Sequence, residues 1–459
     1  MARAPDPPGP PGHWLLGNLR EFRHDMLAFY ERMSRDYGDV VAYRLGPRKS
    51  VLLTHPDLIE QVLVTENRNF IKHYALRLLR PTLGDGLLLS EGEFWLRQRR
   101  LIQPVFNRQR VDSFAAIIVD HTRTMLDSWR PREARDLHAE MMKLALGIVT
   151  KALLDVDSGD NSDEVSRAAD VILADFNSRF KSAFPPPFWL PHPRNWRLKR
   201  QVRRLDALLQ RLITQRRSES EDRGDLLSLL MRARDESDNS GMTDRHLRDE
   251  IMTVYLAGHE TTAHAMAWTW YLLATHPHVE ARLLAEIESV VSDRLPTAAD
   301  VPRLVYAEQV VLESLRLYPP AFVIGREPLH DCTIGGYHVA AGTSILMPQW
   351  VVHRDPRFFD RPGQFDPDRW NDGLMKRLPK YAYFPFGGGP RLCIGNSFAM
   401  LEAILVLATV LPRFRFELSA DVPVVPWPTV TLRPRNGIHA VVHTRSSRVT
   451  ADNTAQQTA

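Results

Sequence analysis

One segment constrains the fold more than any other, because residues 243–276 read as a single long helix. Thr243 is a favourable N-cap, the stretch LRDEIMTVYLAGHETTAHAMAWTWYLLATH is helical in character, and Pro277 ends it. At about 1.5 Å per residue the helix is about 50 Å long, enough to cross the whole molecule. We therefore expect a protein with one long central helix.

The rest of the chain predicts an α+β protein that is mostly α, with small sheets at its margins. Helical patterns fill most of residues 93–320, and a further helix is expected to begin at His55-Pro56-Asp57. Strand-rich segments with turn signals such as Gly46-Pro47 and Asn436-Gly437 predict hairpins. These hairpins are expected at residues 40–54, 333–348 and 429–444.

No change in composition marks a linker, so residues 1–445 are expected to form one domain. The Pro/Gly-rich residues 1–12 should be extended. An apolar Pro-rich loop is predicted at 182–193 and a polar loop at 235–244, while the polar tail 446–459 is expected to be disordered.

Composition excludes several classes of protein. The 59 cationic and 55 anionic side chains give mixed-sign surfaces, so no nucleic-acid partner is expected. Two cysteines exclude a disulfide framework, and Cys332 is interpreted as structural. The N-terminus has no secretory signal, and no apolar run reaches the about 18 residues of a transmembrane helix. We expect a cytoplasmic monomer without a transmembrane anchor.

The second cysteine, Cys393, lies in the glycine-rich stretch FGGGPRLCIG, residues 386–395. A phosphate loop would need Lys-Ser or Lys-Thr after the glycines, and neither follows. A tight turn with a small buried cysteine remains open. The third interpretation is a metal thiolate: one cysteine cannot form a structural zinc site, but it can be the axial ligand of a haem iron. Glycines would let the backbone approach the macrocycle, Arg391 could pair with a propionate and Phe386 could shield the sulfur.

Phe386, Gly389, Arg391, Cys393 and Gly395 match the pattern F-x-x-G-x-R-x-C-x-G. This stretch resembles the haem-binding loop of the cytochrome P450 superfamily, the haem-thiolate monooxygenases, of the soluble bacterial type. The resemblance implies a triangular, mostly helical prism with haem b bound by Cys393. In the same loop it also implies that Gly387 contacts the haem.

A second motif, AGHETT at residues 257–262, resembles the oxygen-activating stretch of that family. The resemblance implies that Ala257 and Gly258 line the haem and that Glu260 and Thr261 relay protons. A helix kink with a surface glutamate is the alternative. His259 occupies a variable position of the motif and is not expected to be a ligand.

Three further elements resemble the family in the expected order. Glu313 and Arg316, one helical turn apart, would form a structural charge network with Arg369, although a simple surface pair is the alternative. The resemblance also implies that haem propionates are bound by Trp95 and Arg99, in a W-x-x-x-R pattern, and by Arg326. The alternative for the W-x-x-x-R segment is a solvated basic helix face.

The resemblance implies a monooxygenase that inserts one oxygen atom from O2 into a lipophilic substrate. A fatty acid is favoured over a terpenoid, a steroid or another secondary metabolite, with a substrate carboxylate met by His73, Tyr74, Arg77 and Arg80. The rivals are a haem sensor or carrier and a rearrangement catalyst.

Electrons would come from a ferredoxin or flavodoxin-type donor with its reductase, because no segment reads as a redox domain. An acidic donor would be steered to a basic patch on the thiolate side. The expected patch consists of Arg97, Arg99, Arg100, Arg108, Arg110, Lys376, Arg377 and Lys380. The apolar loop 184–191 is expected to form the substrate mouth or to touch a membrane, with core packing as the alternative.

Overall fold

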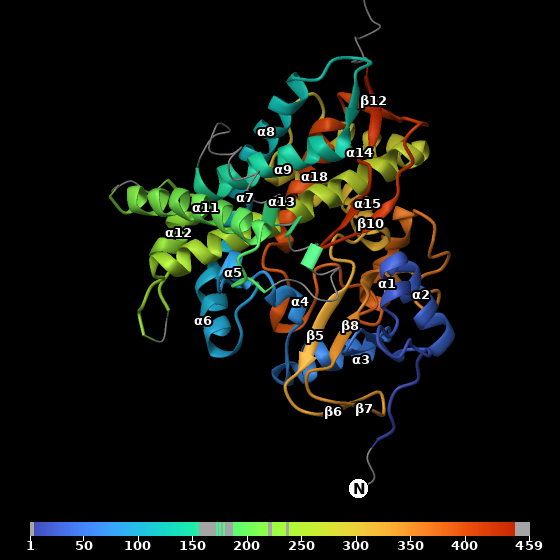
Figure 1. The fold of residues 1–459 in the computed structure, drawn as a ribbon. Coiled ribbons are helices and arrows are strands. Elements are labelled where there is room, and N and C mark those ends of the chain that lie inside the picture. Colours follow the sequence, from blue (N-terminus) through green and yellow to red (C-terminus); the bar gives the residue numbers. More distant parts are fainter. Residues whose placement is uncertain are drawn as a thin grey trace, which may run out of the picture.

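The computed structural model describes residues 4–155, 171–172, 174–175, 178–179, 187–218, 223–235 and 238–445. The loop predicted at 182–193 falls partly outside these residues, and the tail predicted at 446–459 falls wholly outside them. Helices fill the upper and left parts of Figure 1, and the largest sheet lies at the lower right with α1, α2 and α3.

The fold is mostly helical, as the sequence predicts. The α-helices are α1 (Leu19–His24), α2 (Met26–Tyr37), α3 (Pro56–Glu60), α4 (Tyr74–Arg77), α5 (Arg80–Leu83), α6 (Gly92–Ile102), α7 (Arg108–Ser113), α8 (Ala115–Asp127), α9 (Leu137–Leu154), α11 (Pro193–Ser218), α12 (Leu226–Arg232), α13 (Asp244–Thr275), α14 (Pro277–Val291), α15 (Val305–Leu317), α16 (Gln349–Val352), α17 (Leu374–Arg377) and α18 (Asn396–Val410).

The strands are short and form small sheets. They are β1 (Val40–Leu45), β2 (Arg48–Leu53), β3 (Phe70–Lys72), β4 (Ala134–Asp136), β5 (Ile324–Pro328), β6 (Cys332–Ile334), β7 (Tyr337–Val339), β8 (Ser344–Met347), β9 (Phe414–Leu418), β10 (Pro426–Pro428), β11 (Leu432–Pro434) and β12 (His439–Thr444). Within the described residues the sheet orders are β1-β2-β8-β5-β3, β4-β12-β9, β10-β11 and β6-β7.

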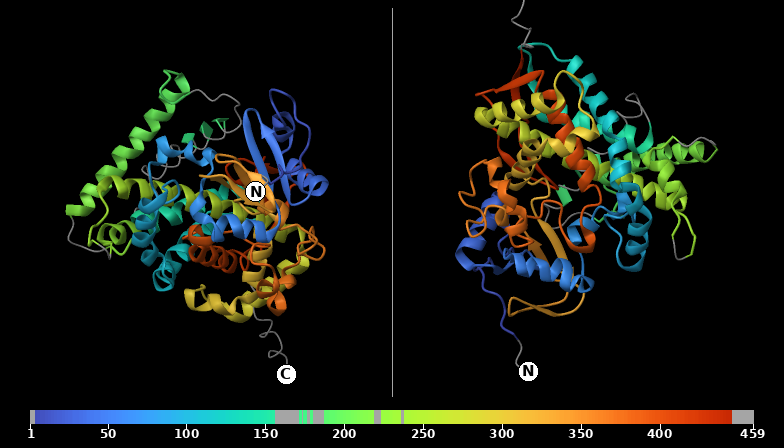
Figure 2. Two further views of the ribbon diagram at one scale, coloured as in Figure 1. Left: turned by 90° about the horizontal axis from the view of Figure 1, so that it is seen from below. Right: turned by 180° about the vertical axis from the view of Figure 1, so that it is seen from behind.

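The long helix predicted from the sequence is α13. The Thr243 hydroxyl accepts a hydrogen bond from the His246 N–H, and the helix ends at Thr275, before Pro277 starts α14. Most of its side chains are buried, and it packs against α9, α15 and α18 in the centre of the molecule (Figures 1 and 2). Among the described residues, no helix is both long and apolar enough to cross a membrane.

The hairpin predicted at 40–54 is confirmed by the antiparallel pair β1–β2. The hairpin predicted at 333–348 is confirmed only for β6–β7, because β8 leaves it to pair with β2 and β5. Residues 4–12 contain no helix, and the carbonyls of Pro8 and Pro5 accept hydrogen bonds from the N–H groups of Ala42 and His338.

The hairpin predicted at 429–444 is wrong. Strand β11 pairs with β10, whereas β12 pairs with β4 and β9 in another sheet. The Asp136 carboxylate accepts a hydrogen bond from the Ile438 N–H at 2.9 Å, and a Cβ on Gly437 would lie 2.4 Å from the same carboxylate. Tertiary contacts of the Asn-Gly turn therefore override its local preference for a hairpin.

Candidate functional site

The stretch FGGGPRLCIG, called the cysteine loop from here on, folds into a tight turn between α17 and α18. The Cys393 N–H donates to the Phe386 carbonyl at 3.0 Å. Gly389 has a φ of +65°, and a Cβ there would lie 2.0 Å from the Leu63 carbonyl oxygen; at Gly388 it would lie 2.1 Å from the Tyr381 ring. Close packing requires both glycines, and at Gly389 the positive φ requires glycine as well.

The Cys393 thiol keeps accessible surface although surrounding protein raises its pKa by burial. This combination is expected for a side chain that faces the interior and keeps one side open for a bound group. The Gly395 N–H and the Arg99 guanidinium act in the opposite direction and favour the thiolate. Among the described residues, no group of three or more His, Cys, Asp or Glu side chains could hold a metal ion. A metal at Cys393 would therefore need most of its ligands from a prosthetic group.

Three cations gather beside the cysteine loop: Lys72, Arg326 and Arg391. Strands β3 and β5 place Lys72 opposite Arg326, and both side chains are less than a tenth exposed. Burial and then Arg391 lower the pKa of Lys72 well below its usual value, and the same two causes lower the pKa of Arg326 to about 10. Positive charge is therefore concentrated in a poorly hydrated place.

Among the described residues, Glu91 is the carboxylate that pairs with these cations. Glu91 pairs with Arg391 and also accepts the Lys72 backbone N–H at 2.7 Å. Glu250 lies nearby, but burial raises its pKa to about 8, so it carries a proton at neutral pH. The excess of positive charge is the environment that the carboxylates of an anionic ligand would neutralise.

Sequence analysis missed Lys72, Glu91 and Glu250. A signal existed for Lys72, because it is the third residue of the strand FIK and shares its inward face with buried Phe70. No comparable local pattern marks Glu91, whose role depends on Arg391 three hundred residues away along the chain.

Trp95 and Arg99 lie on α6 but act on different partners. The Arg391 guanidinium carbon stands 4.2 Å from the centroid of the Trp95 ring, a cation–π contact. Arg99 instead donates to the Leu392 carbonyl of the cysteine loop at 2.9 Å. The structure thus places Trp95 with the three cations and Arg99 with the thiol, and direct binding of a propionate by Arg99 stays a prediction.

The AGHETT motif lies midway along α13. The Thr261 hydroxyl donates to the Ala257 carbonyl at 2.6 Å, within a continuous helix. Ala257 is exposed although the helix around it is mostly buried, so this one turn has an open face. Glu260 is buried. The turn can therefore present a hydroxyl and a carbonyl to a bound molecule.

Gly258 and His259 of the same motif face α9. A Cβ on Gly258 would approach Val149 to 3.3 Å, so the glycine permits close helix packing, and its predicted contact with a haem stays a prediction. Burial lowers the pKa of His259 to about 4, which keeps it neutral.

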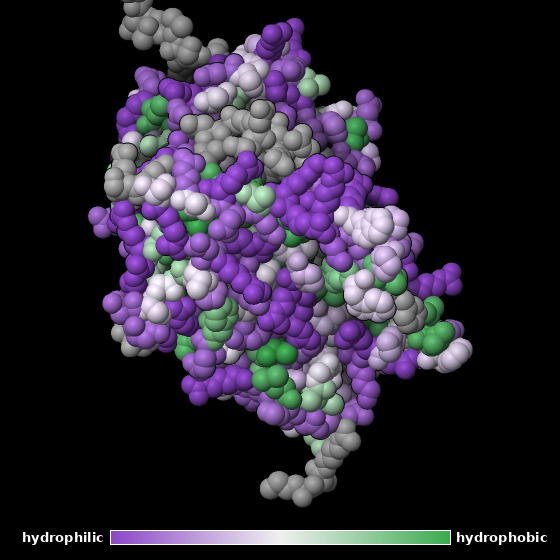
Figure 3. Space-filling view, turned by 60° about the vertical axis from the view of Figure 1, so that its left-hand side comes forward, coloured by the Kyte–Doolittle hydropathy of each residue, from purple (hydrophilic) through white to green (hydrophobic). Residues whose placement is uncertain are grey.

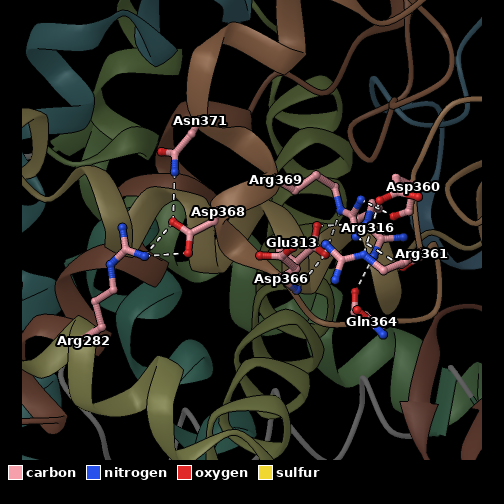
Figure 4. A network of polar contacts seen from close by, with 10 residues as sticks. All are labelled: Arg282, Glu313, Arg316, Asp360, Arg361, Gln364, Asp366, Asp368, Arg369 and Asn371. Atoms are coloured by element: carbon pink, nitrogen blue, oxygen red, sulfur yellow. Dashed lines mark hydrogen bonds and ion pairs between the residues drawn. The ribbon is translucent and has the colours of Figure 1, made fainter.

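Behind the cysteine loop, Glu313, Arg316 and Arg369 form a buried network (Figure 4). Nε and Nη2 of Arg316 donate to the two oxygens of the Glu313 carboxylate, at 2.9 and 2.8 Å. Arg369 donates to the same carboxylate at 3.3 Å. Sequence analysis did not foresee the remaining partners: Trp370 bonds Glu313, and the carbonyls of His353, Pro362 and Gln364 accept from Arg316.

The predicted basic patch needs correction. Arg97 and Arg100 both form ion pairs with the buried Asp235, at 3.8 and 3.1 Å, although Arg100 stays about half exposed. Lys380 lies 3.7 Å from Glu60. The exposed cations of the patch that have no carboxylate partner among the described residues are Arg108, Arg110, Lys376 and Arg377.

The residues predicted to meet a substrate carboxylate also have other partners. Arg77 pairs with Glu327 at 2.5 Å, and Arg80 pairs with Asp85 at 2.5 Å. Tyr74 lies under the Arg48 guanidinium, whose carbon is 3.7 Å from the ring centroid. Burial lowers the pKa of His73 to about 3. These contacts leave no unpaired cation of the predicted set to bind a carboxylate.

Comparison with known proteins decides the family. The cytochrome P450 profile matches residues 7–441. The chain belongs to the cytochrome P450 family. It is 36% identical to cyclooctatin synthase of Streptomyces melanosporofaciens over 404 residues, which cover 87% of this chain and 86% of the relative. It is 33% identical to pentalenene oxygenase of Streptomyces avermitilis over 416 residues, covering 90% and 91%.

A cytochrome P450 carries a haem with a cysteine thiolate ligand. The residues present fit that cofactor on two counts. Cys393 offers a partly open sulfur with a hydrogen-bond donor beside it, and Lys72, Arg326 and Arg391 offer surplus positive charge for two propionates. Cys393 would bind the iron, and the three cations would hold the propionate edge.

Proposed function

We propose that this cytochrome P450 monooxygenase oxidises a lipophilic terpenoid that has no carboxylate. The names of its relatives support this substrate class. Pentalenene denotes an unsaturated hydrocarbon, and a second relative from Streptomyces melanosporofaciens, 35% identical over 404 residues, is cyclooctat-9-en-7-ol 5-monooxygenase, named for an unsaturated alcohol. The fatty-acid substrate favoured by sequence analysis has no such support.

The pairing of Arg77 with Glu327 and of Arg80 with Asp85 is the observation that favours a substrate without a carboxylate. A fatty-acid carboxylate brought into an apolar site needs a cation or several donors. Arg77 is bound to Glu327, which is itself buried, and Arg80 to Asp85. Breaking the Arg77 pair would leave Glu327 buried and uncompensated, so this arginine is costly to recruit.

The haem, when bound, supplies the activation of O2 and the insertion of one oxygen atom into a C–H or C=C bond. The protein's own contribution on the thiolate side is the Gly395 N–H, which hydrogen-bonds the sulfur, and Arg99, whose charge favours the thiolate. Both would stabilise the sulfur as a thiolate, the form that binds an iron.

On the opposite side we assign proton handling to Glu260 and Thr261. The Thr261 hydroxyl proton, now directed at the Ala257 carbonyl, lies on the open face of α13 and can turn toward a bound molecule. We assign the replacement of that proton to the carboxyl of the adjacent, buried Glu260. A protein that merely carries or senses haem has no need for such a pair.

Electrons require a separate redox protein, and we place its docking site at Arg108, Arg110, Lys376 and Arg377. Helix α7 packs on α18, which begins three residues after Cys393, and α17 precedes the cysteine loop. An acidic ferredoxin or flavodoxin would be steered to these exposed cations. Electron transfer should therefore slow as ionic strength rises.

The test is a substrate titration followed by optical absorption. The purified holoenzyme should shift to high spin with terpene hydrocarbons and alcohols, and weakly or not at all with fatty acids. Arg77→Gln with Glu327→Gln, which removes the pair together, should leave the terpenoid response unchanged. A larger response to fatty acids that this double variant abolishes would overturn the proposal.

Turnover separates the remaining alternatives. A monooxygenase consumes reductant in step with product, a rearrangement catalyst forms product without reductant, and a sensor forms none. Product that carries label from 18O2 is the expected result.

A further inference from the structure

Helix α11 carries an unusual concentration of exposed charge. Its inner face is apolar and buried through Leu198, Leu205, Leu208, Leu209 and Ile213. The outward face holds the cations Arg197, Lys199, Arg200, Arg203 and Arg204, all exposed. In Figure 1 the helix lies at the edge of the molecule, and Figure 3, which turns that side forward, shows hydrophilic side chains gathered there.

These five cations have no carboxylate partner within the described residues, unlike several other charges of the helix. Arg194 pairs with Asp175, Arg217 pairs with Asp244, and Asp206 pairs with Arg248 of α13. The cations at 199 and 203 and those at 200 and 204 stand four residues apart, a spacing at which like charges repel. This repulsion destabilises the isolated helix, and an anionic partner would relieve it.

Exposed apolar side chains lie beside the same cations. Trp189 is 78% exposed, Leu190 37% and Trp196 64%. The fully buried Asn195 fixes them in place, because its amide donates to the carbonyls of Pro187 at 2.8 Å and Leu190 at 2.9 Å. Two tryptophans are therefore held outward by a defined turn.

We propose that residues 187–204 form a docking surface for an anionic lipid bilayer, on which the protein lies without spanning it. A cluster of lysines and arginines on an amphipathic helix is attracted to anionic headgroups, and tryptophan prefers the interface between headgroups and acyl chains. An acidic protein or a nucleic acid would be drawn by the charge but gives no comparable role to two exposed tryptophans and a leucine. The benefit of this docking to the enzyme rests on the proposed function, because a lipophilic terpenoid substrate concentrates in membranes.

The test uses the full-length holoenzyme and vesicle flotation. The protein should bind vesicles that contain phosphatidylglycerol, bind weakly to vesicles of phosphatidylcholine alone, and dissociate as salt is raised. The triple variant Arg197→Gln, Arg200→Gln, Arg204→Gln should lower the partition coefficient about 100-fold, because each cation near an anionic surface contributes about fivefold. The matched control removes three exposed cations elsewhere, by Arg110→Gln, Lys376→Gln and Arg377→Gln, and should bind vesicles as the unaltered protein does.

Tryptophan fluorescence reports the orientation. Lipids brominated on the acyl chains should quench emission of the bound protein, and the double variant Trp189→Phe, Trp196→Phe should lose that quenching while it still binds. Equal binding to both kinds of vesicle, no binding to either, or the same loss in the control triple variant would overturn the proposal. So would binding to an acidic redox protein or to DNA through α11 without affinity for vesicles.

The outcome is independent of the substrate assignment. Spin-state titrations in the absence of lipid test the terpenoid proposal, and flotation in the absence of substrate tests the docking surface. A failure of one leaves the other measurable.

Discussion

Two groups of buried charge differ in how their members are paired. In the first, the Glu313 carboxylate is held by Arg316, Arg369 and the Trp370 indole, and three backbone carbonyls satisfy the rest of Arg316. In the second, the charges of Lys72, Arg326 and Arg391 all act on the one carboxylate of Glu91. Every donor of Arg316 has a partner among the described residues, and we propose that an anionic ligand completes the second group.

This difference distinguishes a charge network that stabilises the fold from one suited to binding a ligand, and it is visible without comparison to any relative. A buried charge is tolerated when hydrogen bonds and opposite charges surround it, as they surround Arg316. A buried cluster of like charges lowers the pKa of its members, as it does for Lys72 and Arg326. Such a cluster costs stability in the free protein and returns it when two carboxylates bind. The concentration of buried positive charge at Lys72, Arg326 and Arg391 therefore supports our proposal that this group holds the cofactor.

The largest expected effect comes from breaking the complete network. Glu313→Gln leaves Arg316 and Arg369 without a counter-charge in a place from which water is excluded. We expect a loss of about 3 to 5 kcal/mol in the free energy of unfolding, as for other buried pairs that lose one partner. Denaturant unfolding of the holoenzyme measures it.

The control is a pair drawn in the same view (Figure 4). Arg282 and Asp368 also form an ion pair, at 2.6 Å, but about half of each side chain is exposed. Asp368→Asn should cost less than about 1 kcal/mol. Equal losses for the two variants would mean that burial does not distinguish the pairs, and the comparison would fail.

The second prediction concerns pH and His353, whose carbonyl accepts from Arg316 and whose Nε2 accepts the Phe384 N–H at 2.9 Å. Burial, then Arg316 and Arg354, hold the pKa of His353 well below its usual value. The folded protein keeps this imidazole neutral, whereas the unfolded chain takes up a proton near pH 6.5. The stability that His353 contributes is therefore present above that pH and falls as pH drops, by up to about 1.4 kcal/mol per unit.

His353→Gln should make the fall in stability between neutral and mildly acid pH shallower, although the variant is less stable at pH 7. Denaturant midpoints measured across that range give the slope. His24→Gln, at an exposed position of α1, should leave the slope as it is. An unchanged slope in His353→Gln would show that the folded protein protonates this imidazole as readily as the unfolded chain does.

The third prediction concerns the cluster of Lys72, Arg326 and Arg391. Here the removal of a charge should not lower the stability of the haem-free protein, in contrast to Glu313→Gln. Lys72→Gln removes one of three like charges and keeps a donor for the Leu87 carbonyl, which Nζ now bonds at 3.1 Å. Protein freed of haem should be as stable as before or more so, while the holoenzyme should lose haem about tenfold faster, the effect of one charged hydrogen bond. Transfer of haem to apomyoglobin measures the rate.

Lys376→Gln, at an exposed position of α17, is the matched control and should change neither quantity. If Lys72→Gln destabilised the haem-free protein as strongly as Glu313→Gln does, the cluster would already be balanced within the chain. The distinction between the two groups of charge would then be lost.

Much of the fold and of the first charge network could be predicted from the sequence, because these features depend on local patterns. The helix α13, its cap Thr243 and its end before Pro277 follow from local patterns, and so does the turn formed by the cysteine loop. Glu313 and Arg316 are one turn apart on a single helix, so their pairing is also local. Features that depend on neighbours along the chain are the ones that the sequence displays.

The features that sequence analysis missed depend on distant segments. Lys72 faces Arg326 only because β3 and β5 pair, and Arg97 and Arg100 meet Asp235 across more than a hundred residues. The Asn436-Gly437 turn is a strong hairpin signal, yet contacts with Asp136 direct β12 to another sheet. The pairing of Arg77 with Glu327 was missed for the same reason, since Glu327 lies far away in sequence.

The smallest expected effect concerns Trp95, which contacts Arg391 in the second group of charges. Arg391 has three contacts: Glu91, the Ser90 carbonyl at 3.1 Å and the face of Trp95. Trp95→Leu removes only the aromatic face, which contributes about 0.5 to 1 kcal/mol in a partly exposed setting. We expect haem loss to quicken by about twofold to fivefold, with no change in the haem-free protein. Trp189→Leu, on the outer surface, should leave haem loss unchanged. An effect of Trp95→Leu as large as that of Lys72→Gln would instead mean that the ring itself holds the cofactor, and the indole N–H would then rank with the cations as a ligand of the propionates.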